Sequence, residues 1–220
     1  MKKFTVIVFI FFCSCLSDKD KISISGKIKG LNNSNIYLIQ PENNTLLDSS
    51  IVVNENFNLT AYINEPLELV LKIESKESEN SFSFISEAST KILFTSSKEK
   101  FEFNGKIENS LLNSEFEKLK SQINKYEDND LEMLGQQIEA SVEKNKKKYD
   151  SLSKERVKFT QKKILFIVNY CINNNTNILS PYLAYKYKEN INYNYLENIF
   201  RNLSEEMKKT YYGSRLISNP

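Results

Sequence analysis

The hydrophobic pattern of this chain changes period once, near residue 109, and this change constrains the fold more than any other feature. Up to residue 108, apolar and polar residues alternate, as they do in strands that bury one face. Beyond residue 109, apolar residues recur three and four positions apart, which is the spacing of a helix with one buried face. Strands followed by helices predict an α+β fold, with a β domain over 21–108 and a helical domain over 109–220.

The β half contains eight short runs rich in β-branched and aromatic residues, separated by turn-forming Asn, Pro and Ser. Short strands at regular spacing predict an N-terminal antiparallel β-sandwich or a partly open barrel. The expected strands cover 22–28, 36–39, 46–53, 57–63, 67–73, 82–85, 92–94 and 101–107.

The second half is predicted to form a C-terminal helical bundle. The first two helices are expected over 112–126 and 131–149, with the polar stretch 127–130 as the turn between them. The pair Ser180-Pro181 predicts an N-cap followed by proline at the first helical position. The other expected helices cover 153–173, 182–189, 193–202 and 204–216.

The chain begins with the pattern of an export signal. Lys2 and Lys3 precede an unbroken apolar run, Phe4–Phe12. A helix of nine residues is too short to cross a hydrocarbon core about 30 Å thick. It has the length of the apolar region of a signal peptide, which is removed after export.

The end of this run resembles the lipobox of bacterial lipoproteins, because the small residue Ser14 immediately precedes Cys15. This interpretation makes 1–14 a signal peptide, Cys15 the site of lipid attachment, including palmitate, and 15–20 a lipid-anchored linker. Several acyl chains anchor a protein stably to a membrane. The sequence thus predicts an outer-membrane lipoprotein of the cell envelope; the alternative is an ordinary secretory signal with incidental cysteines.

Composition excludes several kinds of chemistry. The chain has no His, which removes Ser-His-Asp and Cys-His hydrolases and His-ligated metals. Five Gly residues leave no Gly-rich phosphate loop, and 30 Lys and Arg against 28 Asp and Glu give no general attraction to nucleic acid. The sequence therefore predicts a protein that is not an enzyme, with no catalytic residue, cofactor, metal site or nucleic-acid partner.

The third cysteine, Cys171, lies among apolar residues of an expected helix. With Cys13 removed and Cys15 acylated, it is the only thiol expected in the mature chain, which excludes an intrachain disulfide. No charged neighbour is apparent that lowers its pKa. We expect Cys171 to be an inert residue of the core.

Two charged clusters have alternative interpretations. Asp128, Asp130 and Glu132 faintly resemble a calcium loop, but they lack its glycine turn and distal glutamate, which favours a polar turn between helices. Lys144 and Lys146–Lys148 are expected to form a solvated helix face, with lipid headgroups as the alternative partner.

Tyrosines cluster late in the chain. Their position favours packing between short helices over a hydrated binding interface, which is the alternative. They lie at 182, 185, 187, 193, 195, 211 and 212.

Six segments are characteristic in their order and spacing: Ile24–Gly30, Ile36–Leu38, Leu46–Leu59, Phe103–Ser110, Ser180–Tyr185 and Tyr212–Ile217. Together they resemble a domain of unknown function that is common in lipoproteins of Bacteroidetes, and the resemblance covers roughly residues 21–217. In that family the domain usually precedes a TlpA/ResA-type thioredoxin-like domain, a membrane-anchored thiol–disulfide oxidoreductase. Here the chain stops at Pro220, about where that domain would begin, and the Cys-x-x-Cys pair has no counterpart.

These observations predict a non-catalytic lipoprotein of the cell envelope that acts as a binding or accessory module. The resemblance implies a separate thioredoxin-like redox protein as a candidate partner in trans. One alternative is a truncated thiol–disulfide oxidoreductase that lacks its catalytic domain. Another is a carrier of a small ligand, which requires a cavity in the fold.

Overall fold

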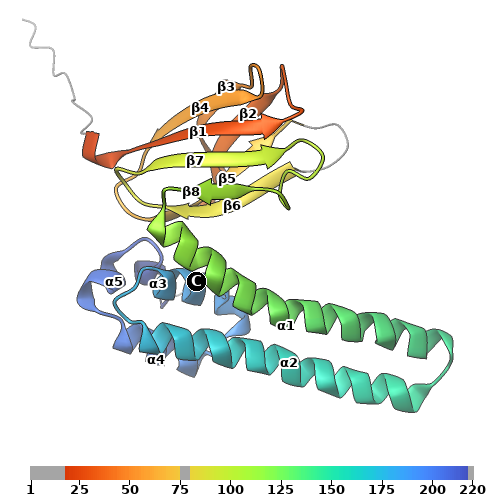
Figure 1. The fold of residues 1–220 in the computed structure, drawn as a ribbon. Helices are drawn as coiled ribbons and strands as arrows, with labels where there is room; N and C mark the ends of the chain where they lie inside the picture. The colour runs from red at the N-terminus through yellow and green to blue at the C-terminus, as the bar shows by residue number, and fades with distance from the viewer. Residues whose placement is uncertain (1–17, 75–79, 218–220) are drawn as a thin grey trace, which may run out of the picture.

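The computed structural model describes residues 18–74 and 80–217, so the expected signal peptide and Cys15 lie outside the described residues. Two four-stranded sheets come first and helices follow, which confirms the α+β prediction (Figure 1). The sheets are separate and do not close into a barrel, so the sandwich is the correct alternative. The strands are β1 (Lys21–Lys29), β2 (Asn35–Gln40), β3 (Thr45–Ile51), β4 (Asn56–Tyr62), β5 (Leu67–Ile73), β6 (Asn80–Ser86), β7 (Lys91–Ser97) and β8 (Lys106–Glu108).

One sheet has the strand order β4-β1-β7-β8 and the other β3-β2-β5-β6. Among the described strands, all paired neighbours are antiparallel except β1 and β7, which run parallel. The prediction of a purely antiparallel domain is therefore wrong at this one pair. A tight hairpin makes its two strands antiparallel, whereas β1 and β7 are separated by five intervening strands and are free of that constraint.

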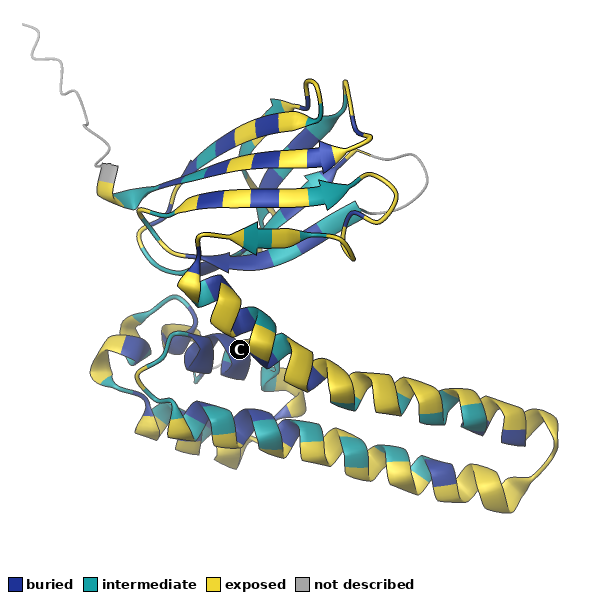
Figure 2. Cartoon of the chain, in the orientation of Figure 1, coloured by how far each residue is buried: buried dark blue, intermediate teal, exposed yellow. Residues whose placement is uncertain are grey.

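Alternating residues of the strands build the core between the two sheets (Figure 2). Ile22, Ile24 and Ile28 of β1 are fully buried, and each such side chain contributes about 1.5–3 kcal/mol to folding. The ring centroids of Phe82 and Phe94, from opposite sheets, lie 5.2 Å apart. These contacts across the sandwich hold the sheets face to face.

The expected strand over 101–107 is largely wrong, because 101–104 form a turn and β8 covers only three residues. Phe101 is buried, with its ring centroid 5.6 Å from that of Phe94. Two residues later, Phe103 is 84% exposed. In a strand these two side chains would share one face, so the turn is what separates them.

The helices are α1 (Leu111–Val142), α2 (Lys146–Asn173), α3 (Leu179–Lys186), α4 (Tyr193–Asn202) and α5 (Glu205–Lys209). Short 3₁₀ turns cover Asp18–Asp20, Pro41–Asn43, Lys188–Asn190 and Gly213–Arg215. No helix in the part of the chain that the structure describes combines the length and the hydropathy of a membrane span.

The polar turn expected at 127–130 is wrong, because α1 continues through it. This stretch holds no glycine or proline, and Arg156 of α2 donates two hydrogen bonds to the carboxylate of Asp130, at 2.8 and 3.0 Å. The chain reverses instead at 143–145, where Lys144 has a φ of 57°. The side chain of Asn145 then caps α2 by accepting a hydrogen bond from the Lys148 amide at 3.1 Å.

The cap expected at Ser180-Pro181 is also misplaced. Helix α3 begins at Leu179, whose amide donates to the side-chain oxygen of Asn177 at 2.9 Å. The Ser180 hydroxyl instead donates to the carbonyl oxygen of Asn174 at 2.7 Å. A nearby asparagine thus takes the capping role, and proline sits within the first turn, where it removes no helical hydrogen bond.

The helical half packs under one end of the sandwich, and α1 and α2 form a long hairpin that projects to one side (Figure 1). Asn113 in the first turn of α1 accepts a hydrogen bond from the Ile85 amide of β6 at 3.2 Å. Of the late tyrosines, Tyr182, Tyr185, Tyr211 and Tyr212 pack together as expected, and the ring centroids of Tyr182 and Tyr212 lie 5.2 Å apart. The expectation is wrong for Tyr193 and Tyr195, which are exposed. The short helices and α1 together create a concave junction with the sandwich.

Candidate binding cleft

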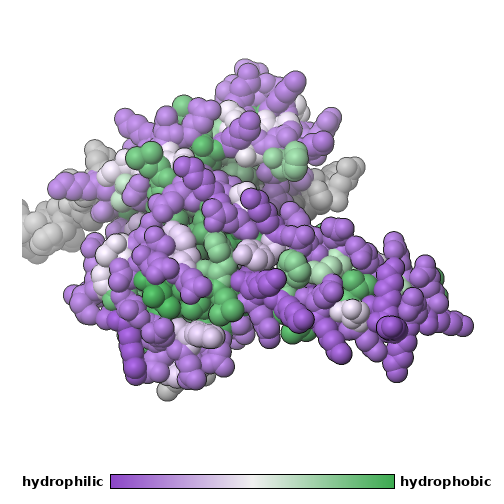
Figure 3. Space-filling model, turned by 60° about the horizontal axis from the view of Figure 1, so that its bottom comes forward, coloured by the Kyte–Doolittle hydropathy of each residue, from purple (hydrophilic) through white to green (hydrophobic). Residues whose placement is uncertain are grey.

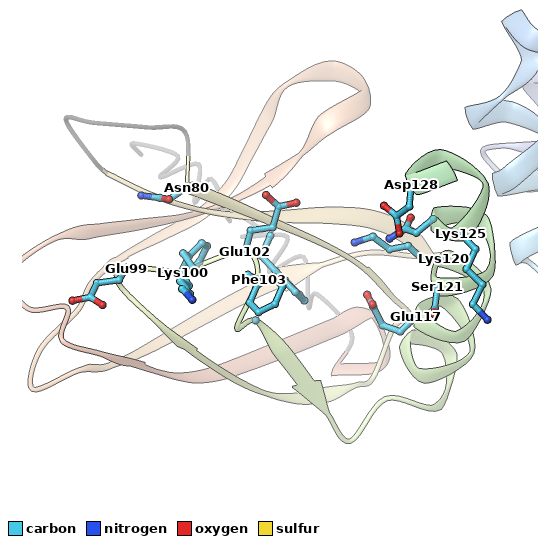
Figure 4. Close-up of a pocket in the computed structure, with 14 residues that line it drawn as sticks. Asn80, Glu99, Lys100, Glu102, Phe103, Glu117, Lys120, Ser121, Lys125 and Asp128 are labelled. Carbon is cyan, nitrogen blue, oxygen red and sulfur yellow. The ribbon is translucent and has the colours of Figure 1, made fainter. Parts of the chain in front are cut away.

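A cleft of about 780 Å³ lies between helix α1 and the loop 98–105, which connects β7 to β8 (Figure 4). The sandwich contributes β6 and this loop to one wall, and the first half of α1 forms the other wall. The lining residues that carry the argument below are Lys100, Glu102, Phe103, Glu117, Lys120 and Asp128.

Phe103 stands at the edge of this cleft with most of its ring in solvent. The loop that carries it is held in place by the buried neighbour Phe101, whose carbonyl oxygen accepts a hydrogen bond from the Ser96 hydroxyl at 2.6 Å. The Lys100 ammonium lies 5.7 Å from the centroid of the Phe103 ring. An exposed aromatic ring on a fixed loop is typical of a surface that binds a partner.

The opposite wall carries charges of both signs. Figure 4 shows Glu117 and Lys120 of α1 across the cleft from Glu102 and Phe103 of the loop. In the described part of the chain, Oε1 of Glu117 is buried and has no hydrogen-bond partner. A buried carboxylate oxygen without a donor is unfavourable, so this oxygen is an unsatisfied acceptor in the wall of the cleft.

A second hollow of about 340 Å³ continues from the first, and Lys120 and Glu102 line both. It lies between the outer face of β5–β6 and helices α1 and α3. The ammonium of Lys186 is 2.9 Å from Oε1 of Glu68 and 2.8 Å from the hydroxyl of Tyr182. This network links α3 to the sandwich in the wall of the second hollow.

Tyr187 also lines the second hollow. Burial, together with the nearby carboxylates of Glu127 and Glu68, raises the pKa of Tyr187 to about 12. Its hydroxyl therefore stays protonated near neutral pH and can donate a hydrogen bond there. The group offers polar recognition and no acid–base chemistry in the ordinary range of pH.

Cys171 lies in the core of the helical half, as expected, and does not line the cleft. Its thiol donates to the carbonyl oxygen of Ser180, with Sγ 3.2 Å from that oxygen. Burial raises the pKa of Cys171 to about 12. The reactive thiolate is consequently disfavoured at neutral pH.

The two charged clusters fall on the hairpin. Asp128, Asp130 and Glu132 lie along α1, and Asp130 is bound by Arg156. Within the described ranges, no group of three potential ligand side chains is placed to hold a metal ion. Lys146–Lys148 begin α2 at the exposed tip of the hairpin, far from the cleft (Figure 1).

The sequence analysis did not identify the cleft. It placed Phe103 in a strand, where alternation assigned it to the same face as Phe101. The pair Asn104-Gly105 is a turn signal that could have placed Phe103 in a loop. Nothing in the local pattern of Glu117 and Lys120 marks them, because only the packing of α1 under the sandwich brings them opposite this loop.

No curated protein matches this chain. A family model, the domain of unknown function DUF4369, matches residues 22–116. The match spans almost the whole sandwich and the start of α1; it includes the loop wall of the cleft and ends one residue before Glu117, the first residue of the α1 wall. Residues 22–116 of the chain are therefore similar to the DUF4369 family, a domain of unknown function.

Proposed function

We propose that this protein is a non-catalytic lipoprotein of the cell envelope that binds a protein partner in the cleft between its sandwich and helix α1. The observation that carries the proposal is the exposed Phe103 at the edge of a 780 Å³ cleft. Aromatic side chains that are surrounded by polar groups are the usual anchors of protein interfaces. The resemblance of the sandwich implies a thioredoxin-like redox protein as the class of partner, acting in trans.

The lining of the cleft favours a protein over a small apolar ligand. Half of its fourteen lining residues are charged, and both signs are present. Carriers of small apolar molecules enclose their ligand in a mostly apolar cavity. An open cleft with one aromatic anchor and mixed charges suits a loop or a helix end of another protein better.

Lipid attachment at Cys15 is compatible with the binding of a partner in the cleft. If Cys15 carries the lipid, the linker 15–20 spans at most about 20 Å between the membrane and β1. The start of β1 would then stand close to the membrane surface, and the loop 98–105 would lie at the other end of that strand. A partner that is itself held at the membrane would meet the cleft at a raised effective concentration.

Site-specific photo-cross-linking in the native envelope tests the proposal. A benzophenone amino acid replaces Phe103 in the full-length protein, and the control carries it at Leu93, an exposed apolar residue of β7 outside the cleft. We expect a discrete adduct from position 103 and none from position 93, with the partner identified by mass spectrometry. A thioredoxin-like partner would support a role in a redox system.

A matched pair of alanine variants separates binding from capture by chance. F103A should reduce recovery of the same partner by affinity purification at least about tenfold, because truncating an interface anchor costs 2 kcal/mol or more. L93A should leave recovery unchanged. Equal adducts from both positions, or unchanged recovery with F103A, would rule out the cleft as the binding site.

A further inference from the structure

The projecting half of the hairpin, residues 127–163, has its charges separated between its two helices; we name this segment the arm. Between residues 127 and 143 there are six acidic residues and no basic one. Between 144 and 163 there are nine basic residues and two acidic ones. An acidic helix thus lies antiparallel beside a basic helix, and both extend beyond the sandwich and the short helices (Figure 1).

The arm also exposes apolar side chains. On α1, Leu131, Ile138 and Val142 are 67%, 57% and 79% exposed, and on α2 Val157 is 57% exposed. The three α1 residues are seven and four positions apart, so they lie on one face of the helix. Hydrophobic surface is visible between hydrophilic side chains along the projecting part (Figure 3), where exposed residues predominate (Figure 2).

Ion pairs inside the arm account for only part of its charge. Arg156 binds Asp130 with an N–O distance of 2.8 Å, and Lys163 binds Glu127 at 3.1 Å. Other charged residues point to solvent from each helix. The exposed acids on α1 include Asp128, Glu132 and Glu139, and the exposed bases on α2 include Lys147, Lys154 and Lys158.

These two sets have matching helical spacing. The acids occupy positions separated by four and seven residues, and the lysines positions separated by seven and four, so each set forms one stripe along its helix. An acidic stripe and a basic stripe of the same length, carried side by side on one arm, are complementary to each other. A molecule that carries both is complementary to its own copy.

We propose that the arm is a self-association surface, on which the arm of a second copy docks so that α1 of each copy lies along α2 of the other. A twofold axis running along the arm produces this arrangement and brings every acidic stripe beside a basic one. The exposed apolar residues of both copies are then covered within a four-helix contact. Arrangements that place α1 against α1 oppose like charges and are disfavoured.

The test uses the full-length protein in detergent micelles, with its mass measured by sedimentation. The wild type should be dimeric at low salt and should dissociate at 1 M salt, because exposed charges are screened there within about 3 Å. E132K/E139K reverses two of the three charges in the acidic stripe, and K154E/K158E reverses two of the three charges in the basic stripe. Each variant alone should have a dissociation constant at least about tenfold higher than the wild type.

Mixing the two variants gives the decisive result. In a mixed dimer the two reversed stripes face each other with opposite signs, as do the two unchanged stripes, so an equimolar mixture should form a heterodimer although each variant alone associates weakly. K91E/K106E changes two exposed lysines of the sandwich, alters the net charge as K154E/K158E does, and should leave the wild-type dimer intact. Circular dichroism checks that every variant is folded.

Three results would each overturn the proposal. They are a wild type that stays monomeric at about 100 µM and low salt, single-arm variants that dimerise as the wild type does, and a mixture that stays monomeric. If the wild-type protein were monomeric while the arm bound a different protein, the arm would be a docking site for that partner and not for a second copy.

Discussion

The hydroxyl of Tyr212 donates a hydrogen bond of 2.6 Å to Oε1 of Glu42, 170 residues earlier in the chain. The same hydroxyl accepts a hydrogen bond of 2.8 Å from the backbone amide of Glu68. Glu42 and Glu68 belong to the sandwich, and Tyr212 belongs to the C-terminal end of the helical half, where it is buried. One phenol group therefore joins the two halves of the molecule.

Removing this hydroxyl should weaken the contact between the two halves of the molecule. Y212F leaves the partly buried Glu42 carboxylate without its donor, and Oε2 of Glu42 already has no hydrogen-bond partner among the described residues. We expect the free energy of unfolding to fall by about 1–3 kcal/mol, measured by urea titration with circular dichroism. Y195F removes the hydroxyl of an exposed tyrosine and should have no effect. Equal stability of Y212F and the wild type would show that the contact between the two halves does not depend on this hydroxyl.

Gly213, beside this tyrosine, should not tolerate a side chain. A Cβ added there would overlap the backbone carbonyl oxygen of Met207, which cannot move aside as a flexible side chain can. We expect G213A to lower the free energy of unfolding by about 2 kcal/mol or more. At Gly135, in the middle of α1, a Cβ would meet nothing within 4 Å. G135A should therefore raise stability by about 0.5–1 kcal/mol, because alanine favours the helix. Opposite signs for the two variants are the expected outcome of thermal unfolding.

The ion pair between the two long helices should depend on pH. Hydrogen bonds from Arg156 lower the pKa of Asp130 below its ordinary value of 3.8. A carboxylate with a lowered pKa contributes stability above its unfolded-state pKa, and this contribution is lost as the pH falls through the folded-state value. At pH 7, D130N should be less stable than the wild type by about 0.5–1 kcal/mol, a modest amount because the pair is partly exposed. The difference should shrink as the pH falls through the lowered pKa of Asp130. A difference that persists unchanged at low pH would exclude the charge as its source.

Cys171 should be unreactive in the folded protein. Its side chain is fully buried, and its pKa is raised to about 12 by that burial. Alkylation at pH 8 should therefore label the peptide that contains Cys171 only after denaturation, as measured by mass spectrometry of the digest. Rapid labelling of this peptide in the native state would show that the helical half opens to solvent.

Lipid attachment at Cys15 is a separate prediction, since this residue lies outside the described part of the chain. C15A should release the protein from the membrane fraction into the soluble fraction of the envelope, because the acyl chains supply the anchor. C13A is the matched control and should remain in the membrane fraction. Retention of C15A in membranes would contradict the lipobox interpretation.

The sequence predicted the fold class because each half repeats one hydrophobic period over many residues. The alternation of Ile22, Ile24 and Ile28 and the helical spacing of Phe116, Leu119 and Ile123 are local signals that burial then satisfied. The same local reasoning placed Cys171 correctly in the core. It failed where a distant contact decided the outcome, as at Asp130, where Arg156 stabilises a helix through a stretch that reads locally as a turn.

Neither the cleft nor the hydrogen bonds that join Tyr212 to the sandwich could be predicted from the sequence, for the same reason. Phe103 is exposed because the loop turns away after the buried Phe101, and Glu117 faces it only because α1 packs under the sandwich. The sequence alone determined the two periods, the apolar run at residues 4–12 and the lack of histidine, all of which are properties of neighbouring residues or of composition. Only the tertiary structure decided which residues from distant parts of the chain meet, because packing between the halves sets those contacts and no local pattern records them.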